Sequence, residues 1–236
     1  MNYIQIIKQE LYKYREPEKA DFLPGFFKCY PGGYGEGDQF IGVRVPHQRK
    51  VAKKYYKQIS LKDVSKLLND PVHEYRLTGL FILINKYQKA DQNKKQEIVD
   101  LYLNHLDGVN NWDLVDSSAD KILGDFLFNR DKSLLYKLAK SGELWKQRIA
   151  IIATKYFIKK NQYRHTLEIA KLLLNHDHDL IHKAVGWMLR EVGKRNQAIE
   201  INFLKKHYKK MPRTMLRYAI EKFEPKLRKK FLNGQI

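Results

Sequence analysis

Cysteine, long apolar runs and negative charge are all scarce in this chain of 236 residues. A single cysteine, Cys29, excludes an intramolecular disulfide and any multi-cysteine metal site, which favours a reducing compartment such as the cytoplasm. The longest apolar run, LFILI at 80–84, is far shorter than the ~20 residues of a membrane-spanning helix. The N-terminus lacks both an uninterrupted apolar segment and a small-residue cleavage site, so we expect no signal peptide and no membrane partner.

Acidic residues are few relative to basic ones. The 45 Lys and Arg outnumber the 26 Asp and Glu, which leaves a formal net charge of +19. Such an excess favours polyanionic partners, chiefly nucleic acid, although a generally basic surface would give the same total. The segment 205–230 has only two acidic residues, and its basic residues form a candidate surface for tracking phosphates: Lys205, Lys206, Lys209, Lys210, Arg213, Arg217, Lys222, Lys226, Arg228, Lys229 and Lys230.

Apolar residues recur at intervals of three and four, as they do on one face of an α-helix. This spacing predicts helices over 4–14, 47–59, 61–68 and 73–89, the last of them buried. No segment alternates strictly enough to predict a strand. The sequence therefore predicts an all-α fold.

Capping residues support the same assignment. Pro46 and Pro71 stand where helices should begin, because a first-turn proline forfeits no hydrogen bond within the helix. Asp91, Asp131 and Asp179 are predicted N-caps of the helices that follow them.

The helices recur at a loose period. Helices that begin near residues 74, 145, 181 and 211 each carry a basic residue: Arg76, Arg148, Lys183 and Arg213. Units of about 35 residues that pair two helices are typical of HEAT-like repeats. We therefore expect 1–236 to be a single-domain α-solenoid whose second helices line a concave basic face. A plain helical bundle is the alternative.

The segment 30–40 holds four glycines but lacks a preceding strand and the lysine-serine or lysine-threonine ending of a phosphate-binding loop. We interpret it as a connector. Arg44 and Arg49 follow it and flank the start of a helix near Pro46, where anions are favoured. These arginines are candidate phosphate contacts, and solvated surface residues are the alternative.

The segment 110–119, NNWDLVDSSA, places a tryptophan among carboxylates. If Asn111 caps a helix, Trp112 and Asp116 are four residues apart and share a face. Asp113 points elsewhere and would complement the helix dipole. The pattern by itself favours a structural tryptophan with Asp116 in an ion pair, and makes Asp116 the candidate functional carboxylate.

The other two tryptophans repeat this combination of an aromatic ring and a charge. Trp145 and Arg148 are three residues apart, Lys183 and Trp187 are four apart, and Arg190 follows one turn later. Each tryptophan alone is more typical of a core residue. Together, on successive helices of one basic array, they predict an aromatic-lined cleft. Gly186 within a helix costs roughly 1 kcal/mol relative to alanine, which indicates close approach of a backbone or a ligand.

Three histidines in 175–182 (NHDHDLIH) could suggest zinc. His178 and His182 would straddle a helix start, however, and the sequence lacks the H-E-x-x-H pattern of a helical zinc site. We predict a turn between repeats and assign no metal.

Three of these motifs, NNWDLVDSSADKILGDFL, LWKQRIAI and KAVGWMLRE, resemble the AlkD-type DNA alkylation repair glycosylases in order and spacing. YGEGDQFIGVRVPHQR resembles the N-terminal signature of many relatives. The resemblance covers about residues 20 to 225, and Asn111 departs from it where some relatives have another aromatic residue.

The resemblance implies a HEAT-like single domain that wraps duplex DNA and hydrolyses the N-glycosidic bond of 3-methyladenine and 7-methylguanine without a cofactor. It implies that Asp116 is the catalytic carboxylate, that Trp112 and Trp187 pack beside the sugar of the damaged nucleotide, and that Arg148 contacts a phosphate. Lys183, Arg190, Arg213, Arg44, Arg49 and Trp145 complete the predicted DNA contacts. We expect a monomer that acts in base excision repair on a bacterial-type nucleoid.

The residue types suit that chemistry. A cationic purine is already a good leaving group, so one carboxylate suffices to stabilise an oxocarbenium-like sugar and to orient water. Aromatic faces also attract an adjacent cation. The alternatives are a non-catalytic repeat protein that binds distorted or branched DNA, and a protein-binding scaffold for an acidic partner.

Overall fold

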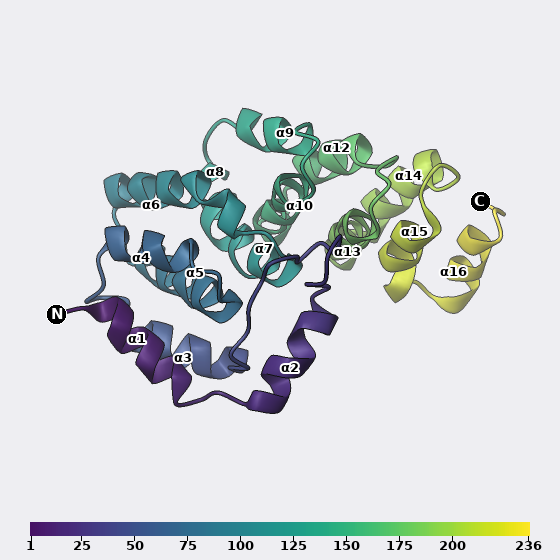
Figure 1. Ribbon diagram of the computed structural model, residues 1–236. Helices are drawn as coiled ribbons and strands as arrows, with labels where there is room; N and C mark the ends of the chain where they lie inside the picture. The colour runs from purple at the N-terminus through teal and green to yellow at the C-terminus, as the bar shows by residue number, and fades with distance from the viewer. The chain divides into compact units, whose positions relative to one another are not determined.

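Helices provide the regular secondary structure of this computed structural model, which describes all residues 1–236 (Figure 1). The predicted all-α class is confirmed. The β pairing is confined to one isolated bridge between Gln39 and Val72. No helix is both long enough and apolar enough to span a bilayer.

The chain forms two compact units, Met1–Ser118 and Ala119–Ile236. The first unit contains α1 (Tyr3–Tyr12), α2 (Pro17–Phe26), α3 (Val45–Tyr55), α4 (Leu61–Leu68), α5 (His73–Tyr87), α6 (Gln92–Asn104), the 3-10 turn η1 (Leu106–Gly108) and α7 (Trp112–Ser118). The grouping of 1–236 into one HEAT-like domain stays a prediction.

The second unit starts with a π-helical turn, η2, and continues through nine further α-helices. Its elements are η2 (Asp120–Gly124), α8 (Asp125–Leu127), α9 (Ser133–Ala139), α10 (Leu144–Ala153), α11 (Lys155–Lys159), α12 (Arg164–Leu172), α13 (Asp179–Arg195), α14 (Gln197–His207), α15 (Arg213–Ala219), η3 (Ile220–Lys222) and α16 (Pro225–Leu232).

Several helix starts follow the predicted capping chemistry. Helix α4 spans the predicted 61–68, and Pro46 occupies the first turn of α3. Asp91 caps α6, because its side chain accepts a hydrogen bond from the backbone N–H of Lys94. These ends are set locally, by side chains that satisfy the first free N–H groups of each helix.

Two predicted caps are wrong by one residue. Helix α13 begins at Asp179 itself, and His178 is its cap, accepting a hydrogen bond from the N–H of Leu180. Lys132 holds the cap position of α9, while Asp131 just before it accepts from the N–H of Ser133. At α13 the histidine thus takes over the expected role of the aspartate, whereas at α9 Asp131 still accepts the first N–H from one position earlier.

Helix α5 is the central helix of the first unit. Its predicted burial is confirmed, since α3, α4, α6 and α7 all pack against it. Arg76 on this helix is only 4% exposed, so the expectation that it adds charge to a basic face is wrong. Its guanidinium is held inside the unit by hydrogen bonds.

Helices of the second unit form two layers (Figure 1). One layer contains α9, α12 and α14; the other contains α10, α13 and α15. Within the second layer, α13 meets α15 closely at Gly186. A Cβ added there would stand 2.5 Å from the carbonyl oxygen of Met215 and 2.5 Å from the Cβ of Tyr218. The predicted close approach at Gly186 is confirmed as a helix–helix contact.

We expect Gly186→Ala to lower the free energy of unfolding by about 1 to 3 kcal/mol, the usual cost of overpacking a tight contact. Urea unfolding followed by circular dichroism measures this change. Gly25→Ala in α2 is the matched control, because a Cβ there meets nothing within 4 Å. The control should be neutral or stabilising by up to about 1 kcal/mol, from helix propensity alone. Equal stability of the two variants would contradict the assigned contact.

Candidate functional site

The first turn of α7 fixes the relative placement of Trp112 and Asp116. Asn111 is fully buried, its side-chain oxygen accepts a hydrogen bond from the N–H of Trp112 at 2.8 Å, and its carbonyl accepts from Val115. The predicted helix start is confirmed. Trp112 and Asp116 therefore lie one turn apart on the same face of α7, and both side chains are half-buried.

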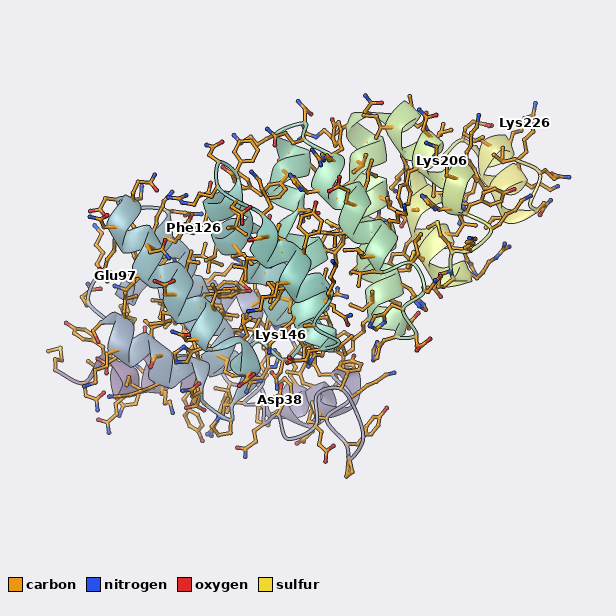
Figure 2. All side chains as sticks on the ribbon, turned by 90° about the horizontal axis from the view of Figure 1, so that it is seen from above. Asp38, Glu97, Phe126, Lys146, Lys206 and Lys226 are labelled. Atoms are coloured by element: carbon orange, nitrogen blue, oxygen red, sulfur yellow. The ribbon has the colours of Figure 1, made fainter.

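Asp113 belongs to a buried chain of charged side chains rather than to that face. His73 lies between two carboxylates, with Nε2 at 2.8 Å from Asp113 and Nδ1 at 2.8 Å from Asp38. Asp38 also accepts a hydrogen bond from Arg76 at 2.6 Å. This network of Asp113, His73, Asp38 and Arg76 is called the His73 network below; Figure 2 labels Asp38 in it.

Arg76 extends the His73 network to the loops around it. Its guanidinium donates hydrogen bonds to the carbonyl oxygens of Asp70 and Gly108 and to the side chain of Asn110, at 2.9 to 3.1 Å. Gly108 and Asn110 come directly before α7. The same guanidinium therefore fixes both the glycine-rich loop, through Asp38, and the segment that leads into Trp112.

Charge balance explains how the His73 network tolerates burial. Burial of the His73 ring opposes its protonation, but the carboxylates of Asp113 and Asp38 override that effect and raise its pKa to about 9. Burial likewise opposes ionisation of Asp38, but its hydrogen bond to His73 and the charge of Arg76 lower its pKa. Two carboxylates then face an imidazolium and a guanidinium, so every buried charge has a hydrogen-bonded partner.

Glu74, beside His73 on α5, fixes the approach to α3. Its carboxylate is 1% exposed and accepts hydrogen bonds from three successive backbone N–H groups, those of Ile41, Gly42 and Val43, at 2.8 to 3.2 Å. Side chains from one turn of α5 thus hold both ends of the segment 38–43.

Trp112 forms part of the wall of an aromatic cavity of about 440 Å³. Phe27 stacks on its ring at a centroid distance of 5.4 Å, and Phe26 meets it edge-on at 5.9 Å. Phe22, Phe26 and Phe40 also line the cavity, and Phe22 and Phe26 are at least half exposed. Trp112 is therefore neither a core residue nor an isolated surface ring; one side packs and another faces this cavity.

The two arginines at the start of α3 make contacts within the protein. Arg44 forms a two-point ion pair with Glu16, at 2.5 and 2.8 Å. The guanidinium of Arg49 lies over the ring of Phe81, 3.9 Å from its centroid. A phosphate would have to compete with these partners, and the DNA-contacting role of both arginines stays a prediction.

Helix α10 carries the predicted pair of Trp145 and Arg148. Arg148 is 5% exposed and donates a hydrogen bond to the carbonyl of Leu180, which ties α10 to the start of α13. Trp145 lies one turn earlier and is half-buried. The phosphate contact assigned to Arg148 stays a prediction.

Helix α13 carries the third predicted group, Lys183, Trp187 and Arg190. The indole N–H of Trp187 donates to Glu191 at 3.1 Å, and the ammonium of Lys155 lies 4.3 Å from the centre of its ring. Burial, opposed by Asp120 and assisted by Lys159, lowers the pKa of Lys155. A cation therefore already contacts the face of this tryptophan.

The remaining predicted contacts have partners inside the second unit. Lys183 pairs with Asp179 at 2.6 Å, and Arg190 pairs with Glu221. Arg213 donates to the carbonyl of Leu232 at 2.6 Å. Lys183 and Arg190 share α13 with Trp187, so the structure brings these three together.

The histidines of 175–182 stabilise a turn. His176 Nδ1 accepts from the N–H of His178, and its Nε2 lies 2.8 Å from the side chain of Gln147. His182 bonds to the carbonyl of His176. Each ring is thus engaged by its neighbours.

Sequence patterns did not identify His73, Asp38 or Glu74 as site-forming residues. A signal was available, since three charged or polar residues (His73, Glu74 and Arg76) interrupt a helix that is otherwise predicted to be buried. Buried polar side chains need partners, and those partners come from the glycine-rich segment that was interpreted only as a connector.

A family model and two solved structures all relate this chain to DNA alkylation repair enzymes. A family model described as DNA alkylation repair enzyme matches residues 7–223. No curated protein sequence shows significant similarity. A solved structure described as a predicted DNA alkylation repair enzyme from Enterococcus faecalis superposes with a TM-score of 0.68 at 15% identity, covering 89% of this chain and 97% of that one. AlkD2 from Streptococcus mutans gives 0.55 at 18% identity, covering 89% and 99%. The chain shares their fold.

We expect the His73 network to make stability depend on pH. A histidine whose pKa is raised from 6.5 to about 9 by folding stabilises the protein fully below pH 6.5, and that contribution is lost as the pH rises through 9. The contribution amounts to about 3 kcal/mol. Urea unfolding of wild type and His73→Gln at pH 6 and pH 10 measures it. The difference in free energy of unfolding between the two proteins should shrink by about that amount from pH 6 to pH 10. A difference that does not change with pH would refute the protonated state of His73.

Proposed function

This chain belongs to the family of DNA alkylation repair enzymes, and we infer that it is a monofunctional glycosylase for cationic alkylated purines in duplex DNA. A role in DNA repair follows from the family. The observation that carries the finer proposal is the placement of Asp116. It shares a face of α7 with Trp112, and the His73 network fixes the start of that helix.

Asp116 would supply the one carboxylate that the reaction requires. Alkylation makes the purine cationic, so the base departs without a strong acid, and positive charge builds up on the sugar. A nearby carboxylate stabilises that charge and orients the attacking water. Asp113 is not suited to this role, because it is already bound to His73.

Aromatic rings would contact the sugar that carries the developing charge. Trp112 borders a cavity lined with phenylalanines, which offers further apolar surface to a damaged nucleotide. Trp187 has the ammonium of Lys155 against its face. That contact supports the proposal, because it indicates that the face of this ring attracts positive charge, as it would have to do in the cationic transition state.

Duplex DNA would be held by the basic side chains predicted from the sequence. Arg148, Lys183, Arg190 and Arg213 come from α10, α13 and α15, and Trp145 precedes Arg148. Arg44 and Arg49 would contribute from α3. We propose that the protein acts as a monomer on cytoplasmic, nucleoid DNA, with binding that weakens steeply as salt rises.

We expect Asp116→Asn to reduce the release of 3-methyladenine and 7-methylguanine from methylated duplex DNA by at least about 100-fold, since the charge that stabilises the sugar is lost. Chromatography of the freed bases measures this release. Asp107→Asn, an exposed change of equal charge just before α7, is the control and should retain activity. Full activity of Asp116→Asn, or no release by wild type, would refute the proposal.

A monofunctional enzyme forms no covalent bond to DNA. We therefore expect borohydride to trap no adduct between the protein and DNA containing an abasic site, as seen on denaturing gels. Lys155 is the lysine to check, because burial lowers its pKa and so makes loss of its proton easier than for an exposed lysine. An adduct abolished by Lys155→Arg would assign a lyase step instead.

Binding alone does not separate this proposal from a non-catalytic protein that holds distorted or branched DNA. Both predict salt-dependent affinity. Tight binding of methylated duplex with no base release would favour the non-catalytic protein.

A further inference from the structure

A groove of about 310 Å³ lies between α12 and α14. This helix layer includes Lys205 and Lys206 of the basic segment 205–230, but none of the residues to which the proposed function assigns DNA contacts. Its apolar floor is formed by Leu167, Ile199 and Phe203. Lys171, Lys206 and His207 supply nitrogen donors along its walls, and Figure 2 labels Lys206 on α14. We call it the α12–α14 groove. It is distinct from the α10, α13 and α15 layer that carries Arg148, Lys183, Arg190 and Arg213.

Positive charge in the α12–α14 groove is not neutralised within the protein. Lys171 and Lys206 are exposed, and neither they nor Lys210 forms an ion pair. Glu168 is the one carboxylate that lines the groove, and it is occupied by Arg164 at 2.8 Å and by the hydroxyl of Tyr136. The arginine cancels the charge of Glu168, so a net positive surface remains.

The pKa of His207 responds to the positive charge of this groove. Its ring packs on Phe203 with centroids 4.6 Å apart, at the edge of the groove. Burial, together with the charges of Lys171, Lys206 and Lys210, lowers its pKa. Lys171 comes from α12, and the other two lysines come from α14 and the turn after it. Cations on both sides of the groove therefore act on one imidazole.

We propose that the α12–α14 groove is a second nucleic-acid contact, which binds the sugar–phosphate backbone of a duplex. Charge complementarity selects this occupant: unpaired lysines on two helices match the regular negative charge of phosphates. The inference rests on the proposed function only in taking duplex DNA as the partner, and it needs no glycosidic cleavage. One protein could then engage two duplex segments, one on each helix layer.

The test is a titration of the full-length protein with an unmodified 12-base-pair duplex, read by calorimetry at low salt. Wild type should bind two duplexes. Lys171→Gln/Lys206→Gln should bind one. The matched control is Lys137→Gln/Lys140→Gln, two exposed lysines of α9 and its C-terminal end, in the same layer but outside the groove, and it should bind two. One duplex on wild type, two on the groove variant, or one on the control would each overturn the proposal.

Histidine NMR places the second duplex. Bound phosphates should raise the pKa of His207, since negative charge favours the imidazolium. Because each neutralised phosphate contributes about −0.9 to the slope of log K against log salt, the groove variant should lose about 2 from the summed slope. A His207 titration unaffected by DNA, or one shifted only by phosphatidylserine vesicles, would overturn the proposal.

Base release from methylated duplex, measured at saturating DNA, distinguishes the two proposals. The groove variant should release base at the wild-type rate, because its substitutions lie outside the proposed catalytic layer. If wild type releases no base yet binds two duplexes, the proposed function fails and the groove assignment stands. If base is released but only one duplex binds, the groove assignment alone fails.

Discussion

The His73 network is the set of buried ion pairs on which the candidate site depends. One imidazolium, clamped by Asp38 on one ring nitrogen and Asp113 on the other, joins the glycine-rich segment, α5 and α7. Arg76 completes the charge balance and binds the segment directly before α7. Hydrogen-bonded charges at this depth tolerate little displacement, because any separation leaves a charge buried without a partner. The position of Trp112 and Asp116 follows from that rigidity.

This arrangement gives the two carboxylates of α7 different tasks. Asp113 holds the helix, and its negative charge is matched by the imidazolium that it contacts. Asp116, three residues later, lies on the Trp112 face, where the proposed substrate would meet it. A single helix turn thus separates a positioning carboxylate from the proposed catalytic one, and the aromatic cavity beside Trp112 adds apolar surface to the same region.

Local patterns predicted a good deal of this protein. Three- and four-residue periodicity predicted the helices and the burial of α5, and the helix cost of Gly186 predicted the close approach that α13 makes to α15. The shared face of Trp112 and Asp116 followed from their spacing once Asn111 was taken as the start of α7. Helix caps were predicted less well at Asp131 and Asp179, because neighbouring residues took the cap positions.

The sequence by itself determined the helical class, the excess of positive charge and the i, i+4 placement of Trp112 and Asp116, because these depend on composition and on helix geometry alone. Only the tertiary structure decided which charges are available. It buried Arg76 and Arg148, neutralised Glu168 with Arg164, and turned Asp38 of an apparent connector into the partner of His73. The physical reason is that a charge acquires its role from the partners around it, and those partners lie up to 40 residues away along the chain in the case of His73 and Asp113.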